Sequence, residues 1–183
     1  MLDASALQPV VYNAGVGTFG AVTDYKHFLP RRAELLAFGA IAASEASWVF
    51  SGLSLYDAAE WPTVERAALR TYLEAYVADR SAAWTALPTA PTIERLDALA
   101  RCFPTDDVVS AIEALPTPSY AMVLGHLGWS LDGMGPELAR VWQAVATADG
   151  ARRVEPLFAE LDERDDLHPI LADLLAVLPS TRR

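Results

Sequence analysis

Asp24, His27 and Arg31 are the residues whose types and spacing best suit chemistry in this chain. A carboxylate three residues before a histidine can orient the imidazole, which can then act as a general base near neutral pH. A structural interpretation is also open, because Pro30 is typical of the first turn of a helix, whose free amide groups need acceptors such as Asp24 and His27. Arg31 can pair with Glu34, three residues later. We favour the structural interpretation over catalysis.

The patterns expected of metal sites and nucleophilic enzymes do not occur in the sequence. The three histidines, His27, His126 and His168, are widely separated, and there is no H-x-x-x-H or E-x-x-H unit. No G-x-S-x-G nucleophile motif is present either. Residues 15–20 match G-x-G-x-x-G by letter, but the strand and the helix that this phosphate-binding motif requires are not predicted around it. The sequence therefore predicts no metal site and no cofactor.

One region of the chain resembles a family signature. It contains Gly17-Thr18-Phe19-Gly20, then His27-Phe28-Leu29-Pro30-Arg31 with Glu34-Leu35-Leu36, and later Trp61-Pro62-Thr63-Val64-Glu65. This arrangement resembles that of a group of small uncharacterised bacterial helical proteins, in which H-F-L-P-R is followed by W-P-x-x-E. The resemblance covers residues 12–87. It implies a helical fold and brings no activity with it.

The tryptophan before Pro62 is the fourth candidate site residue. Trp61 stands at an expected helix start, where it is the best candidate to pack onto residues 24–31. Trp and Tyr are favoured at binding interfaces, but they also fill the cores of helical proteins. We expect core positions for most aromatic residues of this half. Asp24, His27, Arg31 and Trp61 are the candidate binding residues.

Composition and charge restrict the class of protein. The chain has 183 residues, of which 52% are hydrophobic and 21% charged, enough for one domain with a sizeable core. Its net charge of −10 disfavours nucleic acid and anionic membranes as partners. Cys102, the only cysteine, ends an apolar periodic segment, which predicts a buried thiol. No basic residue precedes Lys26, so no signal peptide is predicted and a cytoplasmic location is expected.

The beginning of the chain has no clear helix start. The family resemblance begins near Tyr12, and the similar proteins have more sequence before this point. We therefore expect either that the first dozen residues are loosely held or that the natural reading frame begins upstream of Met1.

Helical periodicity dominates the rest of the chain, and strand-like alternation is nearly absent. Pro30 is expected to open a helix that ends at Gly39, and a second helix is expected over residues 44–55 with Ser44 as its N-cap. A long amphipathic helix is predicted from Pro62 to about Leu87. Shorter helices are expected near residues 93–103, 105–115, 117–131, 136–150, 154–161 and 169–178.

The short joins between these segments determine the predicted fold. They force neighbouring helices to pack antiparallel. We therefore predict an all-α fold, a compact array of eight or nine helices in antiparallel hairpins, as an irregular bundle or a short α-solenoid. Residues 1–183 are expected to form a single domain, with 88–91 as the candidate sub-boundary.

Stacked helices present extended surfaces that bind other proteins. The sequence therefore favours a soluble binding or adaptor module without catalytic activity, whose partner is another protein. One alternative is an enzyme that uses Asp24, His27 and Arg31 in a cleft. The other is an acidic inhibitor or immunity-type protein that masks a basic partner. That alternative requires one shared face for Asp106, Asp107, Glu160, Asp162, Glu163, Asp165 and Asp166.

Overall fold

The computed structural model describes residues 22–41, 46–55, 61–82, 90–160 and 167–179. Within these ranges the chain forms nine α-helices and one short 3-10 helix, without a strand, which confirms the predicted all-α class. The helices are α3 (Val22–Ala37), α4 (Ala46–Leu55), α5 (Thr63–Ala82), α6 (Ala90–Cys102), α7 (Thr105–Glu113), α8 (Thr117–Trp129), η3 (Leu131–Gly133), α9 (Pro136–Val145), α10 (Ala148–Glu160) and α11 (Leu167–Val177).

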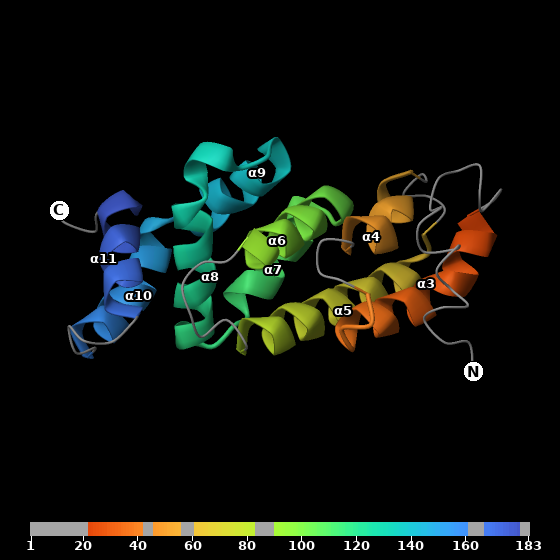
Figure 1. Cartoon of the computed structure of the whole chain (residues 1–183), viewed down its shortest axis with the longest axis horizontal. Helices are drawn as coiled ribbons and strands as arrows, with labels where there is room; N and C mark the ends of the chain where they lie inside the picture. The colour runs from red at the N-terminus through yellow and green to blue at the C-terminus, as the bar shows by residue number, and fades with distance from the viewer. Residues whose placement is uncertain (1–21, 42–45, 56–60, 83–89, 161–166, 180–183) are drawn as a thin grey trace.

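The helices are arranged along the long axis of the molecule in roughly their chain order (Figure 1). Helices α3, α4 and α5 lie toward one end, α10 and α11 lie at the other, and α6 to α9 lie between them. Contacts cross the candidate sub-boundary at 88–91, because α4 packs on α6 and α5 packs on α7 and α8. Helix α3 packs on α4, so it joins the array mainly through that helix.

The core follows the predicted helical periodicity in most segments. In α6 the side chains of Leu96 and Leu99 are buried, and in α7 those of Val108 and Ile112 are buried. Pro118 lies in the first turn of α8 and Pro136 begins α9, positions that tolerate a residue without an amide hydrogen.

Helix α3 begins earlier than predicted. It starts at Val22, so Pro30 lies inside the helix rather than at its start. The prediction that Asp24 and His27 cap a helix opened by Pro30 is therefore wrong. Asp24 lies in the first turn of α3, where a carboxylate interacts favourably with the positive end of the helix.

The predicted end of this helix is confirmed. Gly39 has a φ of +74°, a left-handed conformation that costs glycine little. The amide of Gly39 donates to the carbonyl of Leu36 at 3.1 Å, and the amide of Ala40 donates to that of Leu35 at 2.9 Å. These bonds satisfy carbonyls at the end of α3.

Other predicted boundaries differ from the structure or lie outside it. The helix expected over residues 136–150 is shorter in the structure, because α9 ends at Val145 and Asp149 and Gly150 lie in the first turn of α10. Helix α7 begins at Thr105, as expected, and Pro104 is its N-cap residue. The first dozen residues, the Ser44 cap and residues 83–87 of the long helix lie outside the described residues, so the predictions for them stay predictions.

Helix α5 has one buried face and one exposed face, in line with the predicted amphipathic helix. Leu73, Tyr76 and Val77 are buried, whereas Val64 is 75% exposed. Val64 precedes Leu73 by about two and a half helical turns, which places it on the opposite face. The buried face packs on α7 and α8.

Candidate binding groove between α3 and α5

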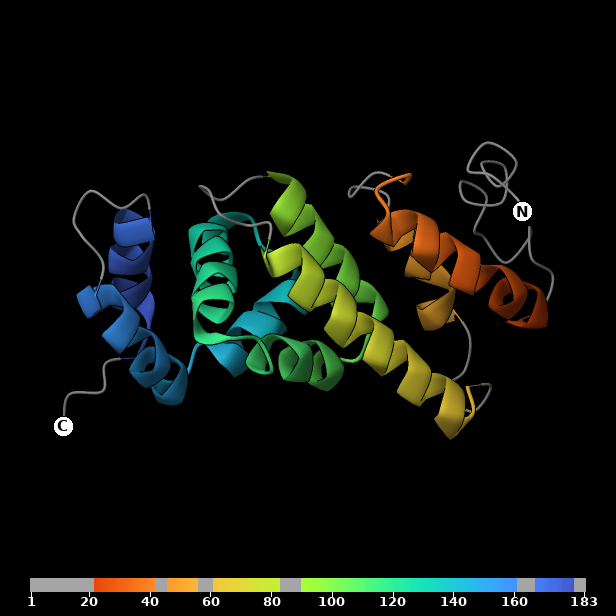
Figure 2. The ribbon, with the colours of Figure 1, turned by 90° about the horizontal axis from the view of Figure 1, so that it is seen from below.

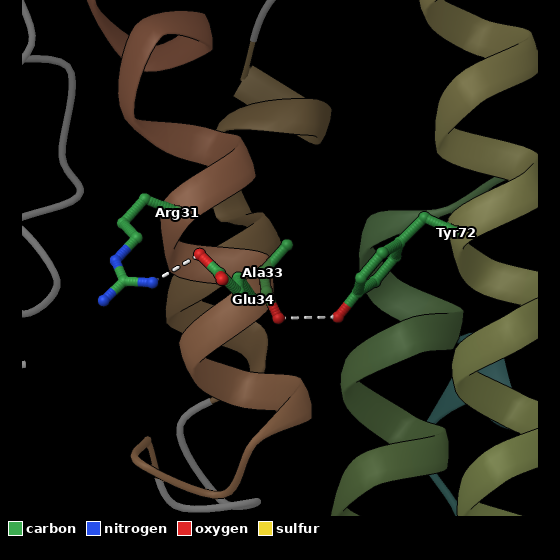
Figure 3. Close-up of polar contacts among 4 residues, drawn as sticks. All are labelled: Arg31, Ala33, Glu34 and Tyr72. Atoms are coloured by element: carbon green, nitrogen blue, oxygen red, sulfur yellow. Dashed lines mark hydrogen bonds and ion pairs between the residues drawn. The ribbon is translucent and has the colours of Figure 1, made fainter. Parts of the chain in front are cut away.

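The four candidate residues from the sequence lie in two different environments. Asp24 and His27 are exposed on α3, and Arg31 is half-buried and pairs with Glu34 (Figure 3). Trp61, just before α5, is only 6% exposed. The ammonium of Lys26 lies over its ring, 4.6 Å from the centroid, and the ring of Tyr25 meets it edge-on at 6.2 Å. The prediction that Trp61 packs onto residues 24–31 is confirmed.

Helices α3 and α5 run side by side in the same direction (Figure 2). Nζ of Lys26 on α3 lies 2.5 Å from Oε2 of Glu65 on α5. The hydroxyl of Tyr72 on α5 donates a hydrogen bond of 2.9 Å to the carbonyl of Ala33 on α3 (Figure 3). Both pairs join residues 39 positions apart in the sequence. An equal offset at two points along the helices means that the helices run parallel, because antiparallel helices would change the offset at each turn.

A groove with a volume of about 630 Å³ lies along these two helices. Phe50 of α4 also lines it, and its ring packs against Tyr72 at 5.8 Å. Tyr72 in turn stacks on Tyr76 at 5.8 Å, which fixes the orientation of the ring in the groove wall. The residues that line the groove are Lys26, Leu29, Pro30, Ala33, Glu34, Ala37, Phe38, Phe50, Trp61, Glu65, Ala68, Leu69 and Tyr72.

The groove is apolar along its walls and carries charge at its edges. Phe38, at the C-terminal end of the α3 wall, is 79% exposed, the largest exposure among the big apolar side chains described. The charged side chains in the lining are Lys26, Glu34 and Glu65. Nε1 of Trp61 is buried and, among the described residues, has no hydrogen-bond acceptor. The groove therefore combines a large exposed aromatic ring with an unsatisfied donor in its wall.

A buried arginine fixes the other face of α3. Arg32 is fully buried, and its guanidinium lies 5.6 Å from the centroid of the Tyr25 ring. Burial lowers the pKa of Arg32, and the nearby Tyr25 opposes that shift. The hydroxyl of Tyr25 donates a 2.7 Å hydrogen bond to the carbonyl of Val49 on α4. These contacts hold α3 against α4, so the helix that forms one wall of the groove is fixed through its opposite face.

Sequence reasoning missed this role of Arg32. A signal was present, because Tyr25, Leu29, Arg32 and Leu36 recur at the spacing of one helical face. That periodicity predicts a buried position for Arg32. The buried position was not predicted because Arg32 is charged and arginine is seldom fully buried.

Two residues outside the groove that could carry chemistry, Cys102 and His126, are buried. Cys102 is buried, as predicted, and burial raises the pKa of its thiol to about 11, which keeps the thiol protonated and unreactive at neutral pH. His126 is buried within α8, and burial lowers its pKa to about 4. Among the described residues no three metal-ligating side chains come together. None of the helices described is both long and apolar enough to span a membrane.

The enzyme and acidic-inhibitor hypotheses gain little from the described structure. An enzyme site would require a pocket holding Asp24, His27 and Arg31, and these residues do not line the groove. Asp107 on α7 pairs with Arg70 on α5, and Glu160 ends α10. The acidic residues at 162–166 lie outside the described part of the chain, so their predicted grouping on one face stays a prediction.

Comparisons with family models, with curated proteins and with solved structures found no match to this chain. The resemblance to the group of uncharacterised bacterial helical proteins therefore stays a prediction.

Proposed function

We propose that this protein is a binding module without catalytic activity, and that the groove between α3 and α5 receives a helical segment of another protein. The observation that carries the proposal is an apolar groove of about 630 Å³ that ends at a phenylalanine 79% exposed to solvent. Exposed apolar surface of this kind is costly in water unless a partner covers it. Amphipathic helices bind such grooves through a stripe of apolar side chains.

The walls of the groove are suited to receive a third helix. Two parallel helices separated by a trough offer side-chain ridges on both sides, into which a helix can pack. The α3 wall runs from Lys26 to Phe38, about 18 Å at 1.5 Å per residue, which matches about twelve residues of a bound helix. Phe38 and Tyr72 supply the aromatic contacts that are enriched at protein interfaces.

Charge and cysteine content support a protein partner and a cytoplasmic location for the proposed module. A net charge of −10 and an acidic groove edge argue for a protein partner rather than a nucleic acid. The single cysteine fits a reducing cytoplasm. We further propose that the chain belongs with the bacterial helical proteins whose signature residues 17–65 resemble.

Site-directed photo-cross-linking in the cells that make this protein tests the proposal. A photo-reactive benzoyl-phenylalanine at position 38, in the groove, is expected to form a covalent adduct with a polypeptide of another protein. The same residue at Gln143, exposed on α9, is the control and should not form that adduct. Mass spectrometry should locate the linked residue in a helical segment of the partner.

Three other results would contradict the proposal. An adduct within the same chain would mean that this protein covers its own groove. A covalent dimer would identify a second copy as the occupant. Equal adducts from positions 38 and 143 would show contact without any preference for the groove.

A further inference from the structure

We infer that the helix bound in the groove carries lysine or arginine side chains on both flanks of its apolar face. This inference rests on the proposed function and goes beyond it by assigning the chemistry of the partner segment. It follows from the positions and exposure of the charged side chains at the groove edge, one carboxylate on each wall.

The carboxylates at the groove are more exposed than the cations that pair with them. On the α3 wall the side chain of Glu34 is 47% exposed, against 27% for its partner Arg31. On the α5 wall the side chain of Glu65 is 40% exposed, against 21% for its partner Lys26. Lys26 is also drawn inward over the Trp61 ring. The charge presented to an incoming segment is therefore mainly negative.

Each carboxylate retains capacity to accept further hydrogen bonds. A carboxylate has about four lone-pair sites, and one ion pair occupies only part of them. A cation on the partner can therefore bind Glu34 or Glu65 without displacing Arg31 or Lys26. This arrangement extends an existing ion pair into a small network, which is worth more than an isolated surface pair.

The two carboxylates are separated along the groove. Lys26 marks the level of Glu65, and Glu34 lies eight residues further along α3, about 12 Å at 1.5 Å per residue. They also lie on opposite walls, because Glu34 belongs to α3 and Glu65 to α5. A partner helix that lies along the groove must therefore present its cations on both flanks, about two turns apart.

Synthetic helical peptides test the inference directly. Three fluorescent peptides of about sixteen residues share one leucine-rich face and differ only on its flanks, which carry lysine, glutamine or glutamate. The lysine peptide is expected to bind most tightly and the glutamate peptide most weakly. Titrations of each peptide against the whole protein at low and high salt should show the difference shrinking as salt is added.

Protein variants separate groove contacts from the general attraction of an acidic protein. Glu34→Gln and Glu65→Gln should each weaken the lysine peptide by about two- to fivefold, the effect of one exposed ion pair. Glu74→Gln removes the same charge from an exposed position of α5 outside the groove and should have little effect. None of the three changes should weaken binding of the glutamine peptide by the two- to fivefold expected for the lysine peptide.

The outcomes distinguish this inference from the proposed function. Equal affinities for the lysine and glutamine peptides would overturn the basic flanks and leave the helix-binding groove standing. If Glu34→Gln and Glu74→Gln weakened binding of the lysine peptide equally, the assignment of the basic flanks to the carboxylates of the groove would be overturned. If no peptide bound more tightly than a scrambled sequence, the proposed function itself would fail.

Discussion

Two helix pairs, α8 with α11 and α3 with α5, lie toward opposite ends of the molecule (Figure 1) and differ in how closely their helices approach. At the contact of α8 with α11, a Cβ atom added to Gly125 would lie 2.5 Å from Cγ2 of Ile170, so the two helices meet closely. Between α3 and α5 the rings of Trp61 and Tyr72 occupy the contact instead. The cavity volumes differ accordingly, at about 150 Å³ beside α8 and α11 and about 630 Å³ beside α3 and α5.

This difference shows how side-chain size at a contact decides whether a helix pair closes or leaves a groove. Glycine removes the side chain that would separate two backbones, whereas an aromatic ring holds them apart. The close contact of α8 with α11 stabilises the fold, because it leaves little space beside these two helices. The open contact leaves apolar surface uncovered at a cost, which is the basis for assigning binding to α3 and α5.

The largest expected effect concerns the histidine in the closely packed region. The folded-state pKa of His126 is about 4, against 6.5 in the unfolded chain, because burial disfavours the charged ring. The unfolded chain therefore binds a proton that the folded chain excludes. This stabilisation is complete above about pH 6.5 and is lost as the pH falls toward 4, on the order of 3 kcal/mol in all.

Urea unfolding between pH 7 and pH 4 measures this loss. In a His126→Leu variant the part of the pH dependence due to this ring should vanish, whereas His27→Gln, at an exposed position, should keep it. Parallel pH curves for the normal chain and His126→Leu would show that the interior around α8 admits water or charge more readily than its packing suggests.

The next effect concerns the glycine itself. Gly125→Ala places a methyl group against Ile170 and should cost about 1–3 kcal/mol of unfolding free energy, because the core must shift to admit it. Gly133→Ala is the matched control, since no atom of the described residues lies within 4 Å of a Cβ atom at that position. Equal urea midpoints for the two variants would show that α8 and α11 do not meet closely at Gly125, and the contrast with the open contact between α3 and α5 would fail.

A smaller effect is expected at the open contact. Tyr72→Phe removes the hydroxyl that donates to the Ala33 carbonyl and should cost about 0.5–1.5 kcal/mol, the net value of one hydrogen bond. Thr71→Val serves as the comparison, because in the described part of the chain its hydroxyl bonds within α5, to the carbonyl of Ala67. Amide exchange in α3 should accelerate in Tyr72→Phe and stay unchanged in Thr71→Val; acceleration in both would mean that the Tyr72 bond is not what ties α3 to α5.

Much of this fold could be predicted from the sequence because apolar periodicity is a local signal. The positions of Leu96, Leu99, Val108 and Ile112 follow from spacing alone. The start of α3 could not be predicted in the same way. A proline usually marks a helix start, yet Pro30 occupies an exposed position inside α3, where packing of the opposite face maintains the helix.

The candidate site could be predicted only in part. Trp61 was found because a tryptophan before a helix-starting proline has few places to pack, and the nearby segment 24–31 was one of them. The groove was not predicted, because it depends on α3 and α5 running parallel at an offset of 39 residues. Nothing local in either segment encodes that offset. Asp24, His27 and Arg31 drew attention through residue type, whereas Lys26, Pro30 and Glu34 of the same helix line the groove.

The central claim is that a partner binds in the groove between α3 and α5. Substitution of two neighbouring alanines of α5 tests this claim most directly. Ala68 and Ala67 are both exposed, but only Ala68 lines the groove. Arginine at either position adds the same charge and volume to one helix.

The measurement is the yield of the partner adduct from a photo-reactive residue at position 38. Ala68→Arg is expected to abolish the adduct and Ala67→Arg to preserve it, with both variants melting at the same temperature as the normal chain. An unchanged yield in Ala68→Arg would show that the partner does not bind in the groove.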